Sequence, residues 1–356
     1  MAGFIAFHGI LILLVITGLF GKLPHASELK RIQNPVATEV FTADSILMGK
    51  YYIQNRQYMA PGQITGTLQN ILIATEDRRF HDHHGIDFRS LGRVMIKTIL
   101  LRKGEAGGGS TITQQLAKNL YPRSDHGFIS MPVNKIREMA TAVRIENVYT
   151  KEEILELYLG TIPFGENTFG IRAASMRFFN KNPRELKIEE AAVLIGMLKA
   201  TSFYNPTRDA EKARIRRNVV LGQMAKYNYI KSAMADSLQQ LPIELNYKPL
   251  PHDAGIAPYF REFLRGELDQ WCRTNLNSEG EYYDLYTDGL KVYTTLDSRL
   301  QQYAEEAVQE HMTNLQILFD KHWRNRNLWK GIQEEMLLIN YDGEYSKEMV
   351  LEETRK

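Results

Sequence analysis

Apolar residues recur every three to four positions through the middle of the chain, from about residue 64 to residue 226. This period places them on one face of a helix, so the sequence predicts a mainly helical region with a buried core. Loops rich in Gly, Pro and Asn separate the helical segments. The clearest of these segments are ILIATEDRRF, IREMATAVRIENVY and KEEILELYL.

Alternation of apolar and polar residues, which is typical of strands, is confined to short segments. Residues 38–41 and residues 289–297 (GLKVYTTLD) alternate in this way. The segment that follows the second one, residues 298–312, has the period of an amphipathic helix. Residues 229–285 show no dominant period and are interpreted as a connector. The sequence therefore predicts a small α+β region after the helical part.

The N-terminus has a different pattern, because residues 3–21 contain no charged residue. As a helix these 19 residues would extend about 28 Å, close to the thickness of the hydrocarbon core of a bilayer. The apolar run is long for a signal peptide, and no A-x-A cleavage site follows it. We therefore predict a membrane anchor. The basic residues after it (Lys22, Lys30 and Arg31), taken alone, would keep the body of the protein inside the cell.

Composition narrows the classes of function only slightly. The chain has 356 residues, 44% of them hydrophobic, and a formal net charge of +2. So small a charge argues against a nucleic-acid partner bound through electrostatics. Cys272 is the only cysteine, so no disulfide can form within the chain.

One segment, GGGSTITQQLAKN at residues 107–119, has the composition of an anion-binding site. Thr111 followed by Gln114 fits a capping box, so a helix is expected to begin here. Gln115 and Lys118 would share a face of this helix with Thr111 and Gln114, offering amides, a cation and free backbone N–H groups to a phosphate or pyrophosphate. A capped surface helix after a flexible loop is an equally good interpretation. The lysine does not fit the spacing of a nucleotide P-loop.

A second segment, EDRRFHDHHGID at residues 76–87, places a carboxylate where it could accept a proton. Glu76 is expected near the C-terminus of a short helix, where the negative end of the helix dipole favours a basic group. The alternative is a surface acidic pair balanced by Arg78 and Arg79. The three histidines that follow do not predict a metal site, because adjacent histidines seldom share one ion and no cysteine ligand is near. They are His81, His83 and His84.

A third segment, NKIREMATAVRIE at residues 134–146, is predicted to be a helix that carries Lys135, Arg137 and Glu138. Considered alone, these charges are most simply a solvated face.

Together the three segments resemble the peptidoglycan glycosyltransferase family, which comprises the polymerase domain of class A penicillin-binding proteins and the monofunctional transglycosylases. The resemblance is carried by E-D-x-x-F-x-x-H-x-G, by G-G-S-T-I-T-Q-Q-L-x-K-N and by K-x-x-E at this spacing. KEEILELYL, FGENTFGIRAAS and LKIEEAAVLIGMLKATSFYNP are similar to later segments of the family. The resemblance extends over roughly residues 52–224.

The resemblance implies a mainly α, lysozyme-like glycosyltransferase domain with a membrane-associated jaw. It also implies polymerisation of lipid II into glycan strands, with inversion at the donor sugar and release of undecaprenyl pyrophosphate. Glu76 would be the general base and Glu138 the second essential carboxylate. Asp77, Phe80 and His83 would support the base. The residues that would contact the substrate on the donor side are Ser110, Thr111, Gln114, Gln115, Lys118, Asn119, Lys135 and Arg137.

The family also implies a location and partners. The protein would be a single-pass protein of the cytoplasmic (inner) membrane with its catalytic domain on the outer, periplasmic face, against the weak signal from the basic residues. Its partners would be lipid II, the growing glycan strand, membrane lipid and cell-wall synthesis proteins, with no nucleic acid. No cofactor is evident, and a divalent cation (Mg²⁺ or Mn²⁺) is compatible with the pyrophosphate.

The sequence departs from the family pattern at a few positions. The third motif usually begins Arg-Lys but here begins Asn134-Lys135, the fourth ends in Gly160 rather than Asn, and Thr201 replaces a Pro. An arginine at position 134 would add donors suited to phosphate, so Asn134→Arg is expected to strengthen substrate binding unless Arg137 compensates. The sequence after residue 309 matches no transpeptidase motif.

The predicted domains are therefore a transmembrane anchor (1–21), a juxtamembrane linker (22–51), a glycosyltransferase domain (52–228) and a linker region leading toward an absent transpeptidase domain (229–356). Two other functions remain open. One is a lysozyme-like or lytic enzyme, which would need no pyrophosphate site. The other is a catalytically weakened cell-wall scaffold.

Overall fold

The computed structural model describes residues 2–324 except 31, 33–35, 54, 57–61, 63, 101–108, 249–254 and 279. These residues belong to two compact units. The first comprises Met1–Phe41 and Leu47–Thr294, and the second comprises Thr42–Ile46 and Thr295–Lys356.

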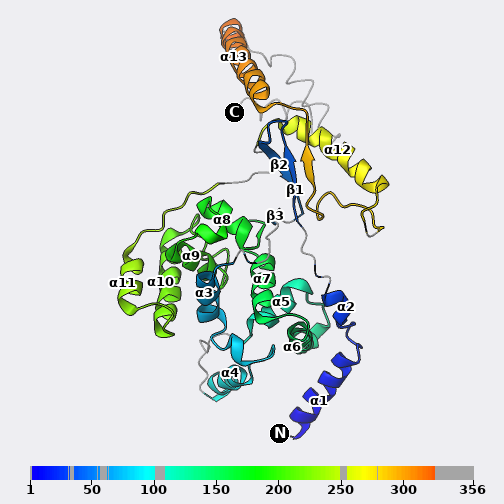
Figure 1. The fold of residues 1–356 in the computed structure, drawn as a ribbon, viewed down its shortest axis with the longest axis vertical. Helices are drawn as coiled ribbons and strands as arrows, with labels where there is room; N and C mark the ends of the chain where they lie inside the picture. Colours follow the sequence, from blue (N-terminus) through cyan, green and yellow to red (C-terminus); the bar gives the residue numbers. More distant parts are fainter. Residues whose placement is uncertain are drawn as a thin grey trace, which may run out of the picture. The chain divides into compact units, whose positions relative to one another are not determined.

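Helices dominate the described part of the first unit (Figure 1). They are α1 (Ala2–Ile16), α2 (Ala26–Leu29), α3 (Gly66–Glu76), α4 (Phe88–Leu100), α5 (Ile112–Leu120), α6 (Ser130–Glu146), α7 (Lys151–Thr161), α8 (Ile171–Phe179), α9 (Ile188–Met197), α10 (Ala210–Lys226), α11 (Ser232–Gln240) and α12 (Pro258–Thr274). Short 3₁₀ turns are η1 (Phe80–Asp82), η2 (Gly127–Ile129) and η3 (Pro183–Glu185). The mainly helical region predicted between residues 64 and 226 is therefore confirmed.

The core of the first unit forms around α9, which packs against α3, α8 and α10 (Figure 1). Every residue of α9 from Ala191 to Met197 is buried, as expected for a helix that is apolar on all sides. The same hydrophobic cluster extends through Leu116 of α5 and Tyr158 of α7. α5 packs against both α6 and α7, so the candidate site residues of α3, α5 and α6 stand on one continuous core.

A small sheet in the first unit joins residues far apart in sequence. β1 (Thr38–Phe41) pairs antiparallel with β2 (Leu47–Tyr51) and parallel with β5 (Lys291–Tyr293). Val40 lies opposite Gly49 on one side and Val292 on the other. The strand predicted at 38–41 is confirmed, and the one predicted at 289–297 is shorter than expected. β3 (Asn55–Arg56) and β4 (Thr168–Phe169) form a separate parallel pair.

In the second unit, α13 (Ser298–Trp323) is more than ten residues longer than the helix predicted over residues 298–312. Asp297 caps its N-terminus, and the Asp297 side chain accepts from the backbone N–H groups of Arg299 and Leu300. Residues 313–323 contain no glycine or proline, which is why the helix continues past residue 312.

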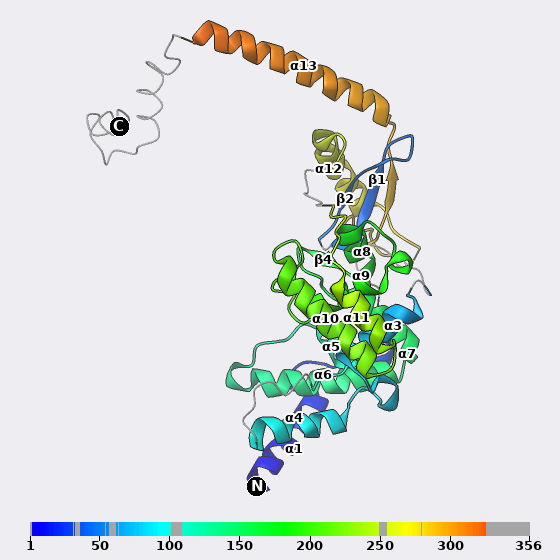
Figure 2. The same ribbon diagram turned by 90° about the vertical axis from the view of Figure 1, so that its left-hand side faces the viewer.

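The N-terminal segment forms a shorter helix than the sequence predicts. α1 ends at Ile16, and turns follow it to residue 21. Leu11 and Val15 of α1 pack on Val133 of α6, and Figure 2 shows the two helices in the same part of the unit. Among the described residues, no helix combines the length and apolarity needed to cross a membrane. The transmembrane anchor is thus unconfirmed and stays a prediction.

Residues 121–134, expected to be irregular, are partly helical. η2 occupies part of this segment, and α6 begins at Ser130 rather than at Asn134. Pro132 does not prevent this, because it lies in the first turn of α6, where a backbone N–H has no partner within the helix. Phe128 and Met131 are 96% and 71% exposed, as the sequence suggests, whereas Ile129 packs against the cluster of Val133.

Candidate active site

The start of α5 is fixed by hydrogen bonds from Thr111 and Gln114. The Thr111 hydroxyl accepts from the Gln114 N–H at 3.1 Å and caps the helix, as predicted. The reciprocal half of a capping box is absent, because the Gln114 side chain does not turn back to the cap. Its amide donates to the Gly85 carbonyl at 3.1 Å, and the Thr111 hydroxyl donates to the same carbonyl at 2.7 Å.

Gly85 makes this arrangement sterically feasible. Its φ is +84°, in a region of backbone conformation that residues other than glycine rarely adopt. A Cβ at this position would lie 2.9 Å from the Ala142 carbonyl carbon of α6. The loop after η1 therefore lies directly against α6 while its carbonyl holds α5.

Asp77 connects the end of α3 to the start of α5. Its Oδ2 accepts from the backbone N–H of Ile112 at 3.1 Å and lies 3.0 Å from Nε2 of His83. Asp77 and His83 are both buried. A carboxylate at a helix N-terminus is stabilised by the helix dipole, so Asp77 fixes the position of its neighbour Glu76 relative to α5.

Glu76, the last residue of α3, is held by a neutral amide. Nε2 of Gln115 donates to Oε2 of Glu76 at 2.9 Å, and Oε1 of Gln115 accepts from the hydroxyl of Tyr158 at 2.9 Å. Burial, and in second place the charge of Glu76, raises the pKa of Tyr158 well above its ordinary value. Tyr158 is therefore a permanent donor, which fixes the amide of Gln115 with its N–H directed at Glu76.

Arg216 of α10 lies close enough to Glu76 for their charges to interact. The sequence analysis did not predict Arg216 as a site residue. Burial lowers the pKa of Arg216, and the charge of Glu76 opposes that effect. Its Nε donates to the Gly196 carbonyl at 3.2 Å. The only signal in the sequence is the basic run RIRR on α10, which a solvated helix would also show.

Three side-chain oxygen atoms surround the ammonium group of Lys135, which is on α6. Its Nζ donates to Ser110 Oγ and to Gln114 Oε1, each at 2.7 Å, and to Glu138 Oε2 at 3.3 Å. Two of these partners are neutral. Burial lowers the pKa of Lys135, while the charge of Glu138 raises it. The arrangement therefore presents a partly buried cation next to the N-terminus of α5, which is a suitable environment for a phosphate oxygen.

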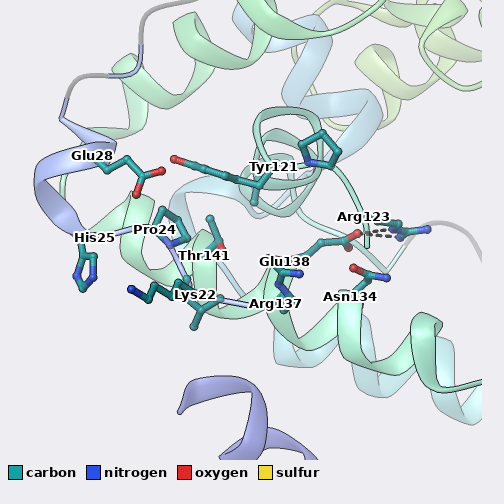
Figure 3. Close-up of a pocket in the computed structure, with 13 residues that line it drawn as sticks. Lys22, Pro24, His25, Glu28, Tyr121, Arg123, Asn134, Arg137, Glu138 and Thr141 are labelled. Atoms are coloured by element: carbon teal, nitrogen blue, oxygen red, sulfur yellow. Dashed lines mark hydrogen bonds and ion pairs between the residues drawn. The ribbon is translucent and has the colours of Figure 1, made fainter. Parts of the chain in front are cut away.

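Glu138 is 7% exposed and is neutralised from two sides. Arg123 donates to its Oε1 from Nε at 2.8 Å and from a terminal nitrogen at 2.8 Å (Figure 3). Lys135 donates to Oε2 at 3.3 Å. Sequence reasoning did not find Arg123, which lies in the segment expected to be irregular. A carboxylate bound in this way is fitted to hold cations in place.

A further network joins α5, α6 and α7 behind these groups. Glu146 accepts from the Thr113 hydroxyl at 2.6 Å and pairs with Lys151 at 2.8 Å. The same ammonium donates to the His83 carbonyl at 2.6 Å and lies 4.3 Å from the centroid of the Phe80 ring. Phe80 itself is fully buried.

The structure brings together most of the predicted site residues, but not all. Lys118 is exposed, although its charge acts on Lys135. Asn119 is half-buried one residue further along α5. Arg137 turns away from Lys135, because its guanidinium donates to Ser124 Oγ at 3.2 Å and lies against Gly21. The roles assigned to all these residues stay predictions.

Asn134, the departure from the family pattern, has a structural role. Its amide donates to the carbonyls of Ser124 and Ser130 at 2.7 and 2.8 Å, and its Oδ1 accepts from the Ser124 N–H at 3.1 Å. The side chain thus ties the segment that carries Arg123 to α6.

A divalent cation beside the pyrophosphate would take oxygen ligands, chiefly carboxylates. In the part of the chain that the structure describes, no group of three or more His, Cys, Asp or Glu side chains is placed to hold a metal ion. Glu138 is occupied by Arg123 and Lys135, and Asp77 by His83 and Ile112. The described side chains alone do not form a metal site, and the cation at the pyrophosphate stays a prediction.

Known proteins are similar to the part of the chain that contains the candidate site. A profile of the family described as "Transglycosylase" matches residues 44–225. Penicillin-binding protein 1A of Escherichia coli (strain K12) is 35% identical over 310 residues, which are 87% of this chain and 35% of that protein. Penicillin-binding protein 1A of Neisseria meningitidis serogroup A is 34% identical over 313 residues, 88% of this chain and 37% of that protein.

A crystal structure of penicillin-binding protein 1A from Haemophilus influenzae aligns with a TM-score of 0.43 and 25% sequence identity. The alignment covers 78% of this chain and 29% of that one. The chain spans about a third of the length of the curated relatives it matches. The family match covers more than half of the chain and includes every predicted site residue, and by it the protein belongs to the transglycosylase family.

Proposed function

We propose that this chain is a peptidoglycan glycosyltransferase that polymerises lipid II with inversion and releases undecaprenyl pyrophosphate. The observation that carries the proposal is the Lys135 ammonium, which two neutral oxygens and one carboxylate hold beside the N-terminus of α5. A leaving pyrophosphate develops negative charge, and preorganised cations and N–H groups favour that charge as it forms.

In this mechanism Glu76 accepts the proton of the acceptor hydroxyl. The hydroxyl oxygen forms a bond to the anomeric carbon of the donor while the bond from that carbon to the pyrophosphate oxygen breaks. Gln115 and Tyr158 hold Glu76 without neutralising it, which leaves its charge available for the proton. Lys135, with Lys118 nearby, stabilises the departing pyrophosphate, and Glu138 keeps Lys135 and Arg123 in place.

The substrate also supports a location at the inner membrane, with the catalytic part on its outer face. The lipid tail of the substrate stays in the bilayer, so the site must lie near the membrane surface. Phe128 and Met131 are exposed apolar side chains on one connected segment, at η2 and the start of α6, and they are suited to contact lipid.

The test is polymerisation of labelled lipid II by the chain in detergent, with glycan product and released polyprenyl pyrophosphate both measured. The wild-type chain should form polymer. Lys135→Gln should lower the rate by roughly two orders of magnitude, the effect of removing one preorganised donor from a developing anion. Lys199→Gln is the matched control, because Lys199 is exposed and forms no ion pair among the described residues. Cleavage of preformed glycan without polymerisation would instead identify a lytic enzyme, and no turnover by a folded wild-type chain would favour a scaffold.

A further inference from the structure

The N-terminal segment lies against α6, the helix that carries Lys135 and Glu138. Leu11 and Val15 of α1 pack on Val133 of α6. Residues 21–29, named the strap from here on, contact the same helix further along, and α2 within the strap packs against it. The strap lies outside residues 44–225, so the family match does not account for it.

The first part of the strap is bound by Arg144 of α6. A terminal nitrogen of the Arg144 guanidinium donates to the carbonyls of Leu23 and Pro24 at 3.2 and 2.8 Å. Both of these residues are buried, and Pro24 lines one pocket together with Thr141 of α6 (Figure 3). The backbone of the strap is therefore attached to α6 at a defined point.

The last part of the strap is bound by Tyr149, which lies in the turn after α6. Its hydroxyl donates to the carbonyl of Leu29 at 2.5 Å, and the Leu29 side chain is fully buried in the core of the first unit. Burial raises the pKa of Tyr149, so the phenol keeps its proton at neutral pH and remains a donor. The strap is thus held at both of its ends.

The contacts with α1 and the strap fall on one side of α6. Val133, Arg137 and Arg144 follow one another at steps of four and seven positions, which return to the same side of a helix. Val133 contacts α1, the guanidinium of Arg137 lies against Gly21, and Arg144 holds the strap as described.

The candidate site falls on the opposite side of the same helix. Lys135, Glu138, Ala142 and Glu146 follow one another at steps of three and four positions. Their contacts are with α5, with the loop at Gly85 and with one another. Because both sets of residues stand on one continuous helix, a shift of the strap side of α6 must also shift the site side.

We propose that the strap fixes the orientation of α6, and with it the height of Lys135 and Glu138 above the bilayer, so that the site meets the pyrophosphate of a membrane-bound substrate. The inference rests on the proposed function and on the membrane location that accompanies it. A lipid-linked pyrophosphate lies at one depth, the surface of the bilayer. A catalytic unit on a loose linker would sample many orientations, whereas a strap that is bound before the substrate arrives removes that entropic cost.

The test loosens the strap with Arg144→Gln and Tyr149→Phe, singly and together. Trypsin cleavage after Lys30, which is exposed at the end of the strap, measures detachment. Loss of three hydrogen bonds in the double variant should raise the cleavage rate by roughly tenfold or more. Arg208→Gln and Tyr259→Phe are the matched controls, because both side chains are exposed and neither has an ion pair or a side-chain hydrogen bond among the described residues.

Polymerisation is then measured on two substrates. Full-length lipid II is supplied in vesicles that contain the chain, and an analogue with a short, water-soluble lipid chain is supplied in detergent. The double variant should lose roughly tenfold of the wild-type rate in vesicles, because its site is no longer held at the surface. Its rate in detergent should stay close to that of the wild-type chain, because a dissolved substrate can approach the site from any direction.

Equal losses on the two substrates would show that the strap only stabilises the fold, and would overturn the inference. An unchanged rate in vesicles, or unchanged cleavage by trypsin, would overturn it as well. A wild-type chain that is inactive on both substrates would instead refute the proposed function, and the inference with it.

Discussion

The two carboxylates of the candidate site differ sharply in what surrounds them. Glu76, at the end of α3, receives a hydrogen bond from the neutral amide of Gln115. Glu138, in the middle of α6, has one oxygen held by Arg123 and the other by Lys135. The first carboxylate keeps its negative charge uncompensated by any direct ion pair among the described residues, whereas the second is surrounded by positive charge.

This difference assigns different tasks to groups of the same chemical type. A carboxylate that must take up a proton should not be neutralised by adjacent cations, because they favour the charged form. A carboxylate that positions cations should be surrounded by them. The surroundings thus support Glu76 as the proton acceptor and Glu138 as the group that organises Lys135 and Arg123.

The largest effect is expected from a substitution of Glu76, which tests the proposed difference between the two carboxylates. Glu76→Gln preserves shape and removes basicity, so lipid II polymerisation should fall by about two orders of magnitude or more while the unfolding temperature stays nearly constant. Glu152→Gln is the matched control, because Glu152 is an exposed carboxylate on α7. Near-normal polymer yield from Glu76→Gln would remove it from the role of base.

The cationic surroundings of Glu138 are tested at Arg123. Arg123→Gln leaves a carboxylate of 7% exposure with Lys135 as its remaining ion-pair partner. We expect a loss of roughly 1–2 kcal/mol in the free energy of unfolding, less than for a fully buried pair because the Arg123 side chain is 41% exposed. The polymerisation rate should fall about tenfold. Combination with Glu138→Gln should be far from additive, since the two residues interact directly. Additive effects of the two changes would contradict the pairing.

Asn134 contributes indirectly to the cationic surroundings of Glu138, because it holds the segment that carries Arg123. Asn134→Ala removes three hydrogen bonds and should destabilise the chain by about 1–3 kcal/mol. Asn134→Arg should also destabilise it rather than strengthen substrate binding, because the position is 5% exposed and its amide is fully engaged. Thermal unfolding and the Michaelis constant measure the two effects. A tighter substrate complex in a stable Asn134→Arg chain would restore the expectation drawn from the family motif.

Tyr158→Phe tests the neutral surroundings of Glu76. This change leaves Gln115 Oε1 without its donor, so it should lower the free energy of unfolding by about 1 kcal/mol near neutral pH. The pKa of Tyr158 is raised in the folded chain, so this tyrosine stabilises the protein below its ordinary pKa of about 10 and loses that contribution as pH rises further. The stability difference between the wild-type chain and Tyr158→Phe should therefore shrink above pH 10. Chemical denaturation at a series of pH values gives this difference, and a constant gap would contradict it.

The sequence predicted the helices and the start of α5 because both depend on local patterns. The apolar period predicted α3, α6 and α7, and the cap at Thr111 lies where the pattern placed it. The local pattern did not predict that the Gln114 amide would donate to the Gly85 carbonyl instead of turning back to the cap. That hydrogen bond joins residues 29 positions apart in the sequence.

The same limit explains the site residues that were missed. Arg123 and Tyr158 act through Glu138 and Gln115, which are distant in sequence, so no spacing rule relates them. The family resemblance assigned Arg137 to the donor side of the substrate together with Lys135, and that role stays a prediction. In the structure the guanidinium of Arg137 lies against Gly21 and donates to Ser124. Helical periodicity gives the direction of a Cβ atom, whereas a long flexible side chain follows the nearest partner.

Gly85 has a consequence for mutational scanning. One carbonyl at this position receives hydrogen bonds from Thr111 and Gln114, and the space that a side chain would need is filled by the backbone of Ala142. In a saturation library, position 85 should therefore tolerate almost no replacement, although glycine has no side chain with which to contact a substrate. A scan read without the structure would assign a chemical role to a residue whose contribution is to let three segments of backbone meet at one point.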